Sequence, residues 1–346
     1  MAGIHRCHLW ISLYFPIGPI GAGAVKLVGM TDMRDILQAA SLLARHLPPT
    51  PMWSYPVLNA VAGAEVWVKH ENTQPIGAFK VRGGITLLAA LPDRSRGVVA
   101  YSTGNHAQSI AYAARLFGAP CAIVMPENPN PSKVAAVEAL GATVVIGGAT
   151  MVEAAEVARE QASRLGRRLI SPADEPEIIA GVGTLYLEIL QAQPDLDTIV
   201  VPVGSGTGAA AACLVARALA PGCQVIAVQS SAAPAAHDSW RLGDLVPRPM
   251  KTRVDGLATG SAYTLPQQVM RDLLTDFLLV SDDEIRAAQH LMLTHAHTLT
   301  EGAGAAALAG VLSRRADFAG KKIAIVASGG NAGPAELTSL LDQRAA

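Results

Sequence analysis

A lysine at the junction of a predicted strand and a predicted helix is the residue best placed for covalent chemistry. The alternating run 65–69 predicts a strand, and the apolar run 85–91 has helical spacing, so Lys80 falls in or near the first helical turn. Pro75 and Gly77 mark the intervening turn. The positive end of the helix dipole and partial desolvation both lower the pKa of an amine placed there, which favours a nucleophile. A single lysine of this kind is, however, more often an ordinary surface side chain.

A second polar segment lies between the predicted strand 98–101 and a predicted helix. Backbone N–H groups at a helix N-terminus that follows hydroxyls and a glycine bind anions, here a substrate carboxylate. The same residue types also cap helices for structural reasons alone, so the segment by itself leaves both interpretations open. It consists of Ser102, Thr103, Gly104, Asn105 and His106.

A glycine-rich segment follows the predicted strand 198–203 and precedes an alanine-rich helix. Closely spaced glycines expose successive backbone amides, which together with a helix N-terminus hold a phosphate. A dinucleotide-binding fingerprint needs another glycine spacing and an acidic residue where this chain has Gln229, and the Gly-Lys-Ser/Thr of a Walker loop is absent. A tight structural turn stays an alternative. The segment consists of Gly204, Ser205, Gly206, Thr207 and Gly208.

In this order the three segments resemble those of the serine/threonine dehydratases, pyridoxal-phosphate enzymes of the tryptophan-synthase-β-like fold type. The resemblance rests first on Ala78-Phe79-Lys80-Val81-Arg82-Gly83 and extends from about Met33 to Pro334. It implies that Phe79 and Lys80 contact pyridoxal 5'-phosphate, Lys80 covalently, and that 204–208 binds the cofactor phosphate. The family has a run of four glycines there, and the hydroxyls of Ser205 and Thr207 are compatible with phosphate binding.

The same resemblance implies roles for the remaining motifs. Residues 102–106 would hold the carboxylate of an amino-acid substrate, and Asn105 would also bond the phenolic oxygen of the cofactor. The run Ser328-Gly329-Gly330-Asn331 resembles a family motif whose serine meets the pyridine nitrogen. Glu301-Gly302-Ala303-Gly304 resembles a motif whose glutamate lies near the cofactor ring. Asp255-Gly256 resembles a pair on a loop that faces the cleft.

The implied activity is that of an ammonia-lyase, or dehydratase, acting on a β-hydroxy amino acid. Lys80 would take the α-proton as general base, and α,β-elimination would yield a 2-oxo acid and ammonia. A substrate of the threonine or serine type is expected. Hydroxyaspartate, phenylserine or a hydroxylated diamino acid would undergo the same chemistry, and the sequence does not choose among them.

Three rival activities are weighed against this hypothesis. A serine racemase-like isomerase needs a second base opposite the lysine, and racemases of this kind have a serine where Thr103 stands. A β-replacement enzyme is disfavoured by His106, because the cysteine synthases have threonine at that place. A non-catalytic Rossmann-like binding protein belongs to another class, and the ordered motifs argue against it.

The regular alternation of strands and helices predicts an α/β fold with mainly parallel sheets. By resemblance this becomes a two-domain arrangement of open twisted sheets flanked by helices, known as PLP fold type II. The small domain is expected at 93–172, and the large cofactor-binding domain at 31–92 and 173–346. A helix is predicted from about Asp32 to Arg45, with a possible N-cap at Thr31-Asp32.

Composition narrows the partners to small molecules and further copies of the chain. The 346 residues carry a formal net charge of -1 with no long basic run, so neither nucleic acid nor a membrane is an expected partner. Four scattered cysteines favour a reduced, cytoplasmic setting. The family resemblance implies a homodimer or homotetramer. No metal is expected, because Gln229 replaces an acidic cation ligand of several family members and His295 and His297 alternate on a predicted helix.

The first thirty residues do not look like part of this fold. The run 9–28 is apolar and glycine-rich, but it contains Pro16 and Pro19 and lacks a small-residue cleavage site. Residues 1–30 are therefore interpreted as an extension outside the fold, with Met30 or Met33 as an alternative start. At the other end, the sequence as given leaves no room for a C-terminal regulatory domain, so feedback regulation by one is not expected.

Overall fold

Two β-sheets organise the protein, and the computed structural model describes residues 31–341. The larger sheet has the strand order β1-β2-β10-β7-β8-β9, and among these described strands each neighbouring pair is parallel except β1 with β2. The smaller sheet is parallel, with the order β5-β4-β3-β6. The larger sheet contains β1 (Met52–Ser54), β2 (Glu65–Lys69), β7 (Thr198–Pro202), β8 (Gln224–Ser230), β9 (Asp276–Val280) and β10 (Lys322–Val326). The smaller contains β3 (Val98–Tyr101), β4 (Cys121–Met125), β5 (Thr143–Ile146) and β6 (Arg168–Ile170).

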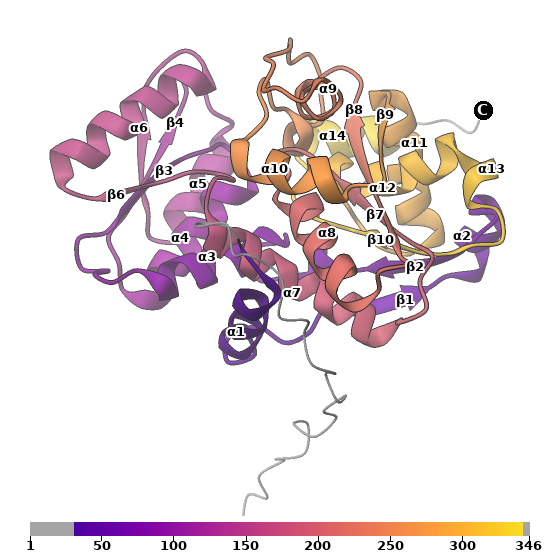
Figure 1. Ribbon diagram of the computed structural model, residues 1–346. Coiled ribbons are helices and arrows are strands. Elements are labelled where there is room, and N and C mark those ends of the chain that lie inside the picture. The colour runs from indigo at the N-terminus through magenta and orange to yellow at the C-terminus, as the bar shows by residue number, and fades with distance from the viewer. Residues whose placement is uncertain (1–30, 342–346) are drawn as a thin grey trace, which may run out of the picture. The chain divides into compact units, whose positions relative to one another are not determined.

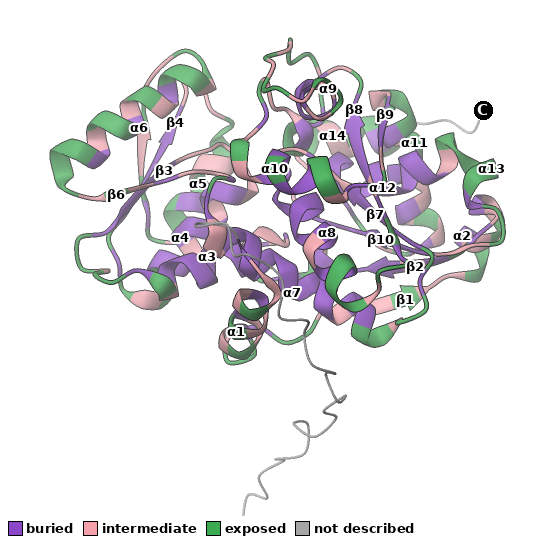
Figure 2. Ribbon diagram, in the orientation of Figure 1, coloured by how far each residue is buried: buried purple, intermediate pink, exposed green. Residues whose placement is uncertain are grey.

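The smaller sheet lies among helices α4 (Asn105–Phe117), α5 (Pro131–Ala139) and α6 (Met151–Leu165). Helix α6 is amphipathic, and its buried alanines at four-residue spacing pack against the strand residues Val99 and Val124. The opposite face of α6 is exposed (Figure 2). The alternation of one apolar and one solvated face thus explains why this helix covers the sheet.

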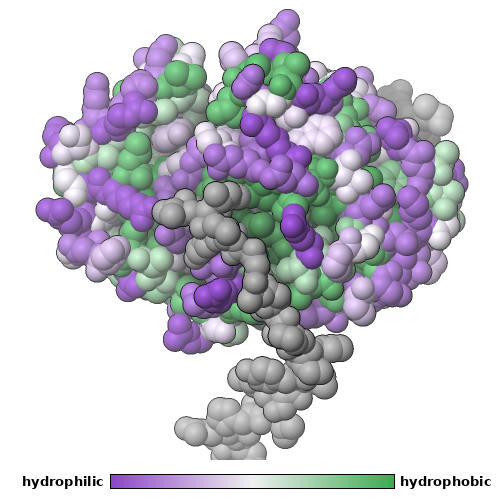
Figure 3. Space-filling model, viewed as in Figure 1, coloured by the Kyte–Doolittle hydropathy of each residue, from purple (hydrophilic) through white to green (hydrophobic). Residues whose placement is uncertain are grey.

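The larger sheet has a fully buried helix against it. Helix α12 is rich in alanine and glycine, and its residues from Gly302 to Val311 are buried in one apolar core with strands of the sheet. Small side chains let its backbone approach the strands closely. The other helices of this part are α2 (Pro56–Ala62), α8 (Thr207–Leu219), α9 (Ala235–Leu242), α10 (Thr264–Leu273), α11 (Asp282–His295), α13 (Arg315–Phe318) and α14 (Pro334–Leu341). On the face drawn in Figure 3, hydrophilic residues cover much of the outer part and hydrophobic residues gather toward the middle.

Helices α3 (Lys80–Ala90) and α7 (Pro176–Ala192) lie in the chain between strands of different sheets. Helix α1 (Met33–Leu43) packs against both of them, and α3 also packs against α4 (Figure 1). Glycine is required where α3 meets α4, because a Cβ on Gly84 would lie 2.3 Å from the Ser109 hydroxyl. The same holds where α3 meets α7, since a Cβ on Gly181 would lie 2.5 Å from the Arg82 carbonyl oxygen. Close helix packing therefore fixes the start of α3.

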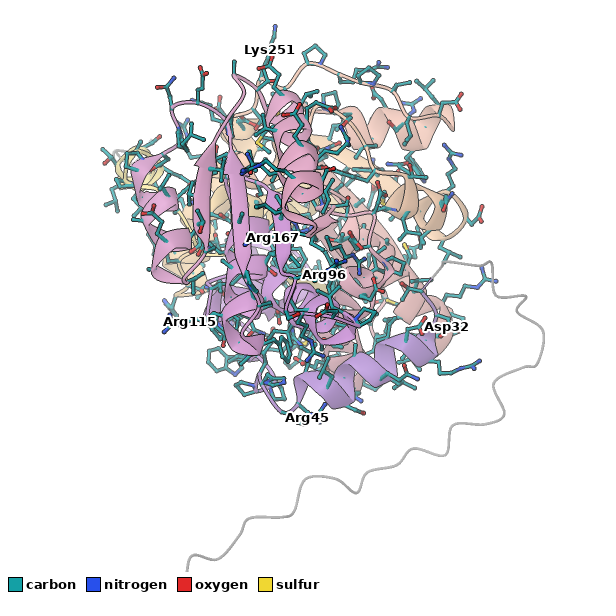
Figure 4. All side chains as sticks on the ribbon, turned by 90° about the vertical axis from the view of Figure 1, so that its left-hand side faces the viewer. Asp32, Arg45, Arg96, Arg115, Arg167 and Lys251 are labelled. Atoms are coloured by element: carbon teal, nitrogen blue, oxygen red, sulfur yellow. The ribbon has the colours of Figure 1, made fainter. Side chains whose placement is uncertain are left out.

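Helix α1 shows how local sequence sets an element's ends. The predicted N-cap Asp32 is confirmed, and its carboxylate accepts the N–H groups of Arg34 and Asp35 in a capping box. Arg45 lies two residues beyond the other end of the helix, and Figure 4 labels both residues. Helix α1 ends at Leu43, two residues before the predicted end.

Most predicted elements are confirmed, and the differences have local causes. The stretches of β1, α2, α9 and α10 were not predicted, because each is short and three of them carry a proline at or near their start. The predicted helix 282–297 ends at His295, and His297 follows it with a φ of 51°. The prediction that both histidines lie on one helix was therefore wrong. The predicted helix 304–315 begins earlier and is followed by the separate short helix α13.

Three further expectations concern the limits of the fold. Every strand of the smaller sheet falls within 93–172 and every strand of the larger sheet outside it, but the domain boundaries themselves stay a prediction. The extension predicted at 1–30 lies outside the described residues. Of the helices between residues 31 and 341, none has the length and apolar character needed to cross a membrane.

Candidate active site

The amine of Lys80 lies against the glycine-rich segment. Lys80 is the first residue of α3, as the sequence predicts, and its Nζ donates hydrogen bonds to Ser205 Oγ at 3.0 Å and to Thr207 Oγ1 at 2.9 Å. The residue is partly buried, but the surrounding protein desolvates its amine and lowers the pKa to about 8. The first and third motifs, 125 residues apart, thus form one site with an amine that loses its proton near neutral pH.

The glycine-rich segment leads into α8 without a capping side chain. Gly206 is the N-cap with a φ of 91°, and no side chain within the described chain caps this helix end. A positive φ of this size suits glycine, which has no Cβ to clash. The N–H groups of the first turn are therefore available to an anion beside Lys80.

Helix α4 begins in the same way at the second motif. Gly104 is the N-cap, and of residues 31–341 none caps the helix with its side chain. The hydroxyl of Ser102 instead accepts the Gly104 N–H at 3.1 Å, and Thr103 between them is partly buried. No side chain of the motif therefore caps α4 directly, and anion binding at this helix start stays a prediction.

His106, the second residue of α4, is a buried imidazole that lacks a partner. Its Nε2 has no hydrogen-bond partner among the residues that the structure describes. Burial, and to a smaller extent the charge of Lys80, lower the pKa of His106 to about 3. A neutral imidazole with an orphaned nitrogen is costly unless a ligand supplies the missing bond, so His106 stays a candidate ligand-binding residue.

A chain of side-chain amides joins the second motif to the two C-terminal ones. Asn105 donates from Nδ2 to Glu301 Oε1 at 2.6 Å, and its Oδ1 accepts from Asn331 Nδ2 at 2.7 Å. Asn331 also donates to the Ile76 carbonyl at 2.8 Å, in the turn that precedes Lys80. The predicted residues 105, 301 and 328–331 are therefore brought together with the lysine segment.

Backbone contacts complete this side of the site. Ser328 is buried, and its carbonyl accepts the Phe79 N–H at 3.0 Å. The backbone of Ala78 also forms a bridge with Gly329. A Cβ on Gly329 would lie 2.3 Å from Glu301 Oε1, so the glycine lets the carboxyl approach the strand end. A main-chain hydrogen bond thus joins Ser328 to Phe79, the residue before Lys80.

Carboxyl groups line a pocket next to Glu301. Its lining includes Asp255, Gly256 and Glu336, and the carboxylate of Glu336 accepts the Gly302 N–H at 2.6 Å. Lys133 of α5 forms an ion pair with Asp255 of η2 (Asp255–Leu257). Burial raises the pKa of Glu301 to about 7, with the Asn105 hydrogen bond opposing and the charge of Glu336 adding to this shift. This part of the site therefore carries more negative than positive groups.

Several residues that shape the site were not singled out from the sequence. Asn331 and Arg82 stood inside quoted motifs, but nothing in the sequence indicated their partners. Ser109 donates to the Lys80 carbonyl at 2.6 Å, and Glu71, in η1 (Glu71–Thr73), binds Arg82. A serine at helical spacing and a glutamate beside a strand give no signal of such contacts. The glycines next to Arg82 were the one available hint of close packing.

The residues at which a metal site was considered, Gln229 and His295, have hydrogen-bond partners outside this cluster. Gln229 is buried, and its Oε1 accepts the His237 N–H at 3.0 Å. The His295 ring shares a hydrogen bond with its neighbour Thr294. Within 31–341, no group of three or more His, Cys, Asp or Glu side chains has an arrangement that could hold a metal ion.

The arrangement fits pyridoxal phosphate on the evidence of the residues themselves. A desolvated amine faces a glycine loop at one helix start, and an orphaned imidazole nitrogen lies at another. A phosphate that bears an aldehyde would bind the Lys80 amine and the glycine loop. A carboxylate would bind the start of α4 and His106. Fold and site together define an α/β enzyme of PLP fold type II.

Comparison with known proteins agrees with this class. The chain belongs to the family described as pyridoxal-phosphate dependent enzyme, whose model matches residues 43–329. It is similar to the L-threo-3-hydroxyaspartate ammonia-lyase of Saccharomyces cerevisiae, with 36% identity over 300 residues, 86% of this chain and 92% of that protein. It is also similar to the L-threonine ammonia-lyase of Thermotoga maritima, with 37% identity over 305 residues, 87% of this chain and 76% of that protein.

A solved structure supports the fold in three dimensions. The structure of maize serine racemase superimposes with a TM-score of 0.85 at 32% identity, covering 90% of this chain and 97% of that one. The predicted fold class, family and cofactor are thereby confirmed. The predicted reaction class agrees with the names of the two ammonia-lyases.

Proposed function

We propose that this protein is an ammonia-lyase that converts L-threonine or L-serine to a 2-oxo acid and ammonia. One observation carries the proposal. The Lys80 amine lies within 3.0 Å of two hydroxyls of the glycine loop, beside a second uncapped helix start that contains His106. This arrangement supplies a nucleophilic amine, a phosphate site and a carboxylate site together.

In this proposal each group of the chain has one task. Lys80 holds the cofactor through Nζ, and residues 204–208 hold its phosphate. The N–H groups at the start of α4 bind the substrate carboxylate, with His106 Nε2 as a further partner. Asn105 has two amide N–H groups and gives one to Glu301, so the second is free to orient the cofactor.

Proton transfer rests on Lys80. Pyridoxal phosphate, when bound, supplies an electron sink for the α-carbon of an amino acid. Lys80 takes the α-proton at Nζ once that nitrogen is neutral and unbonded. With a pKa of about 8, roughly one amine in ten is neutral at pH 7, whereas an ordinary lysine has a far smaller neutral fraction. Desolvation therefore prepares Lys80 as a base.

We propose that the β-substituent of the substrate lies toward the small pocket next to Glu301, whose surrounding charge favours a neutral group. Asp255, Glu301 and Glu336 surround this pocket, and Lys133 is already paired with Asp255. A second substrate carboxylate, as in hydroxyaspartate, would meet carboxyl groups rather than a free cation there. We therefore place threonine and serine ahead of hydroxyaspartate as substrates, although the yeast relative is named for the latter.

A racemase is the second candidate, and the similarity to maize serine racemase is the observation in its favour. Racemisation requires a second base on the face opposite Lys80. Thr103 stands where such racemases have serine, and its extra methyl group restricts the rotamers of the hydroxyl. Elimination is therefore proposed as the main reaction.

The test is an assay of the purified protein with each amino acid in turn. Release of 2-oxobutyrate from L-threonine or pyruvate from L-serine is expected, at a kcat/KM at least tenfold above that for L-threo-3-hydroxyaspartate. Chiral analysis of the remaining serine measures racemisation in the same samples. Formation of D-serine at a rate above that of pyruvate would replace this proposal with the racemase.

Two proposals accompany the activity. The chain is proposed to act as a homodimer or homotetramer in the cytoplasm, as the family resemblance and the buried, free Cys121, Cys213 and Cys223 favour. The domains are proposed to be 31–92 with 173–346, and 93–172. Light scattering of the purified protein measures the oligomeric state.

A further inference from the structure

A network of four charged side chains, three of them buried and Glu188 partly exposed, ties together the two ends of the segment that carries Lys80. Glu71 lies nine residues before Lys80 in η1, and Arg82 lies two residues after it in the first turn of α3. Glu188 reaches them from α7, and Lys69 from the end of β2. Two positive and two negative groups give the network no net charge.

Arg82 is at the centre of the network and uses its whole guanidinium. The side chain is fully buried, at 1% exposure. Its Nε and Nη2 donate to the two carboxylate oxygens of Glu71, both at 2.8 Å. Nη1 and Nη2 donate to the two oxygens of Glu188 at 2.7 and 3.0 Å, and Nη1 also donates to Thr184 Oγ1 at 3.0 Å. All five N–H donors of the group are therefore in hydrogen bonds.

The two glutamates are held in turn by the chain around them. Glu71 accepts from the Thr50 hydroxyl at 2.6 Å, and Glu188 accepts from Lys69 Nζ at 2.5 Å. Burial raises the pKa of Glu71, but the charge and hydrogen bonds of Arg82 lower it by more, so Glu71 is ionised. The pair therefore links η1 to the first turn of α3 by two parallel bonds of fixed geometry.

Stability is a weak reason for such a network. Desolvating four charges offsets most of their mutual attraction, and apolar side chains of similar volume fill such sites at least as well. A guanidinium group that binds a carboxylate on each of two edges instead fixes the orientation of the arginine and of both carboxylates. A bond from Ser109 Oγ to the Lys80 carbonyl, at 2.6 Å, fixes the same turn from α4.

We propose that Arg82, held by Glu71 and Glu188, is a positioning residue that sets the place of Lys80 Nζ at the glycine loop. The inference rests on the proposed role of Lys80. Arg82 donates no hydrogen bond to Ser205 or Thr207, because its five N–H groups bind Glu71, Glu188 and Thr184. Its effect therefore passes through the backbone of the first turn of α3. Lysine at position 82 would keep the charge but has only three N–H donors, so at least two of the five bonds are lost.

The test compares Arg82→Lys with Arg168→Lys in the full-length, cofactor-loaded protein. Arg168, whose side chain is 41% exposed, pairs with the buried Glu175 at 2.6 Å and serves as an arginine–glutamate control outside the lysine segment. Arg82→Lys is expected to lower kcat about 100-fold with KM within threefold, because an error of about 1 Å in a reacting group has that effect. Amide hydrogen exchange of peptide 72–84 is expected to rise in this variant. Arg168→Lys should match the wild type in both measurements.

Two results would overturn the proposal. One is a folded Arg82→Lys protein with kcat within threefold of wild type, and the other is unchanged exchange at 72–84. If Arg82→Lys does not fold, Glu188→Gln replaces it, because this isosteric change keeps both hydrogen bonds from Arg82 to Glu71. A tenfold loss of kcat in Glu188→Gln supports the proposal, and an unchanged kcat refutes it. The exchange measurement needs no substrate, so it decides the matter even where the wild-type protein releases no 2-oxo acid.

Discussion

Replacing Glu301 with glutamine should change how the stability of the cofactor-free protein depends on pH. Burial raises the pKa of Glu301 from 4.5 to about 7, and the residue is 8% exposed. At 1.36 kcal/mol per pKa unit, a shift of this size corresponds to about 3 kcal/mol of unfolding free energy. Glutamine accepts the same hydrogen bond from Asn105 and carries no charge at any pH. The substitution therefore removes the titration and keeps the contact.

The sign follows from where the proton is held. Below pH 4.5 the carboxyl is protonated in both states, and its titration contributes nothing. Between pH 4.5 and about 7 the unfolded chain loses the proton while the folded chain keeps it, so stability falls as pH rises. Above pH 7 both states are ionised and the loss is complete.

Urea denaturation of the cofactor-free protein at pH 5 and pH 8 measures the effect. The wild type is expected to lose about 2–3 kcal/mol more than Glu301→Gln between these pH values. Glu160→Gln serves as the control, because Glu160 is an exposed glutamate of α6. Equal pH dependence in the wild type and Glu301→Gln would refute the reasoning, and so would the same change in Glu160→Gln.

Three further predictions concern single residues of the site. Gly206→Ala places a Cβ at a φ of 91° and 2.9 Å from Pro266, which should destabilise the protein by about 1–2 kcal/mol in urea denaturation and weaken cofactor binding in a fluorescence titration. Thr103→Ser should raise the ratio of D-serine to pyruvate formed from L-serine, as chiral chromatography measures; an unchanged ratio would remove Thr103 from the argument against racemisation. In the cofactor-free protein, amine acylation followed by mass spectrometry should show Lys80 reacting with a midpoint near pH 8, and a midpoint near 10.5 would contradict its desolvation.

Local sequence patterns predicted those helices and strands that bury one face or are buried along their whole length. The predicted strands at 98–101 and 198–203 are short apolar runs between turns; the first forms with these bounds, and the second ends one residue earlier, at Pro202. No element was predicted in the region 230–276, because α9 and α10 are short amphipathic helices with a proline at or near their start. Their positions follow from tertiary packing, which a local pattern does not contain.

The candidate site was predicted as a set of motifs but not as a network. The place of Lys80 at the start of α3 follows from Pro75, Gly77 and the apolar run after them. The contacts of Arg82 with Glu71 and Glu188 join positions 11 and 106 residues apart, and only the folded chain brings them together. The desolvation that lowers the pKa of Lys80 was expected from its place at the start of a predicted helix.

The most direct test of the central claim is reduction of the purified protein with borohydride, followed by peptide mass spectrometry. The account predicts a yellow protein in which the reduced cofactor is attached to Lys80 and to no other lysine. It also predicts that Lys80→Ala is colourless, unlabelled and inactive toward L-threonine and L-serine. A label on another lysine, or release of 2-oxo acid by Lys80→Ala at the wild-type rate, would contradict the account.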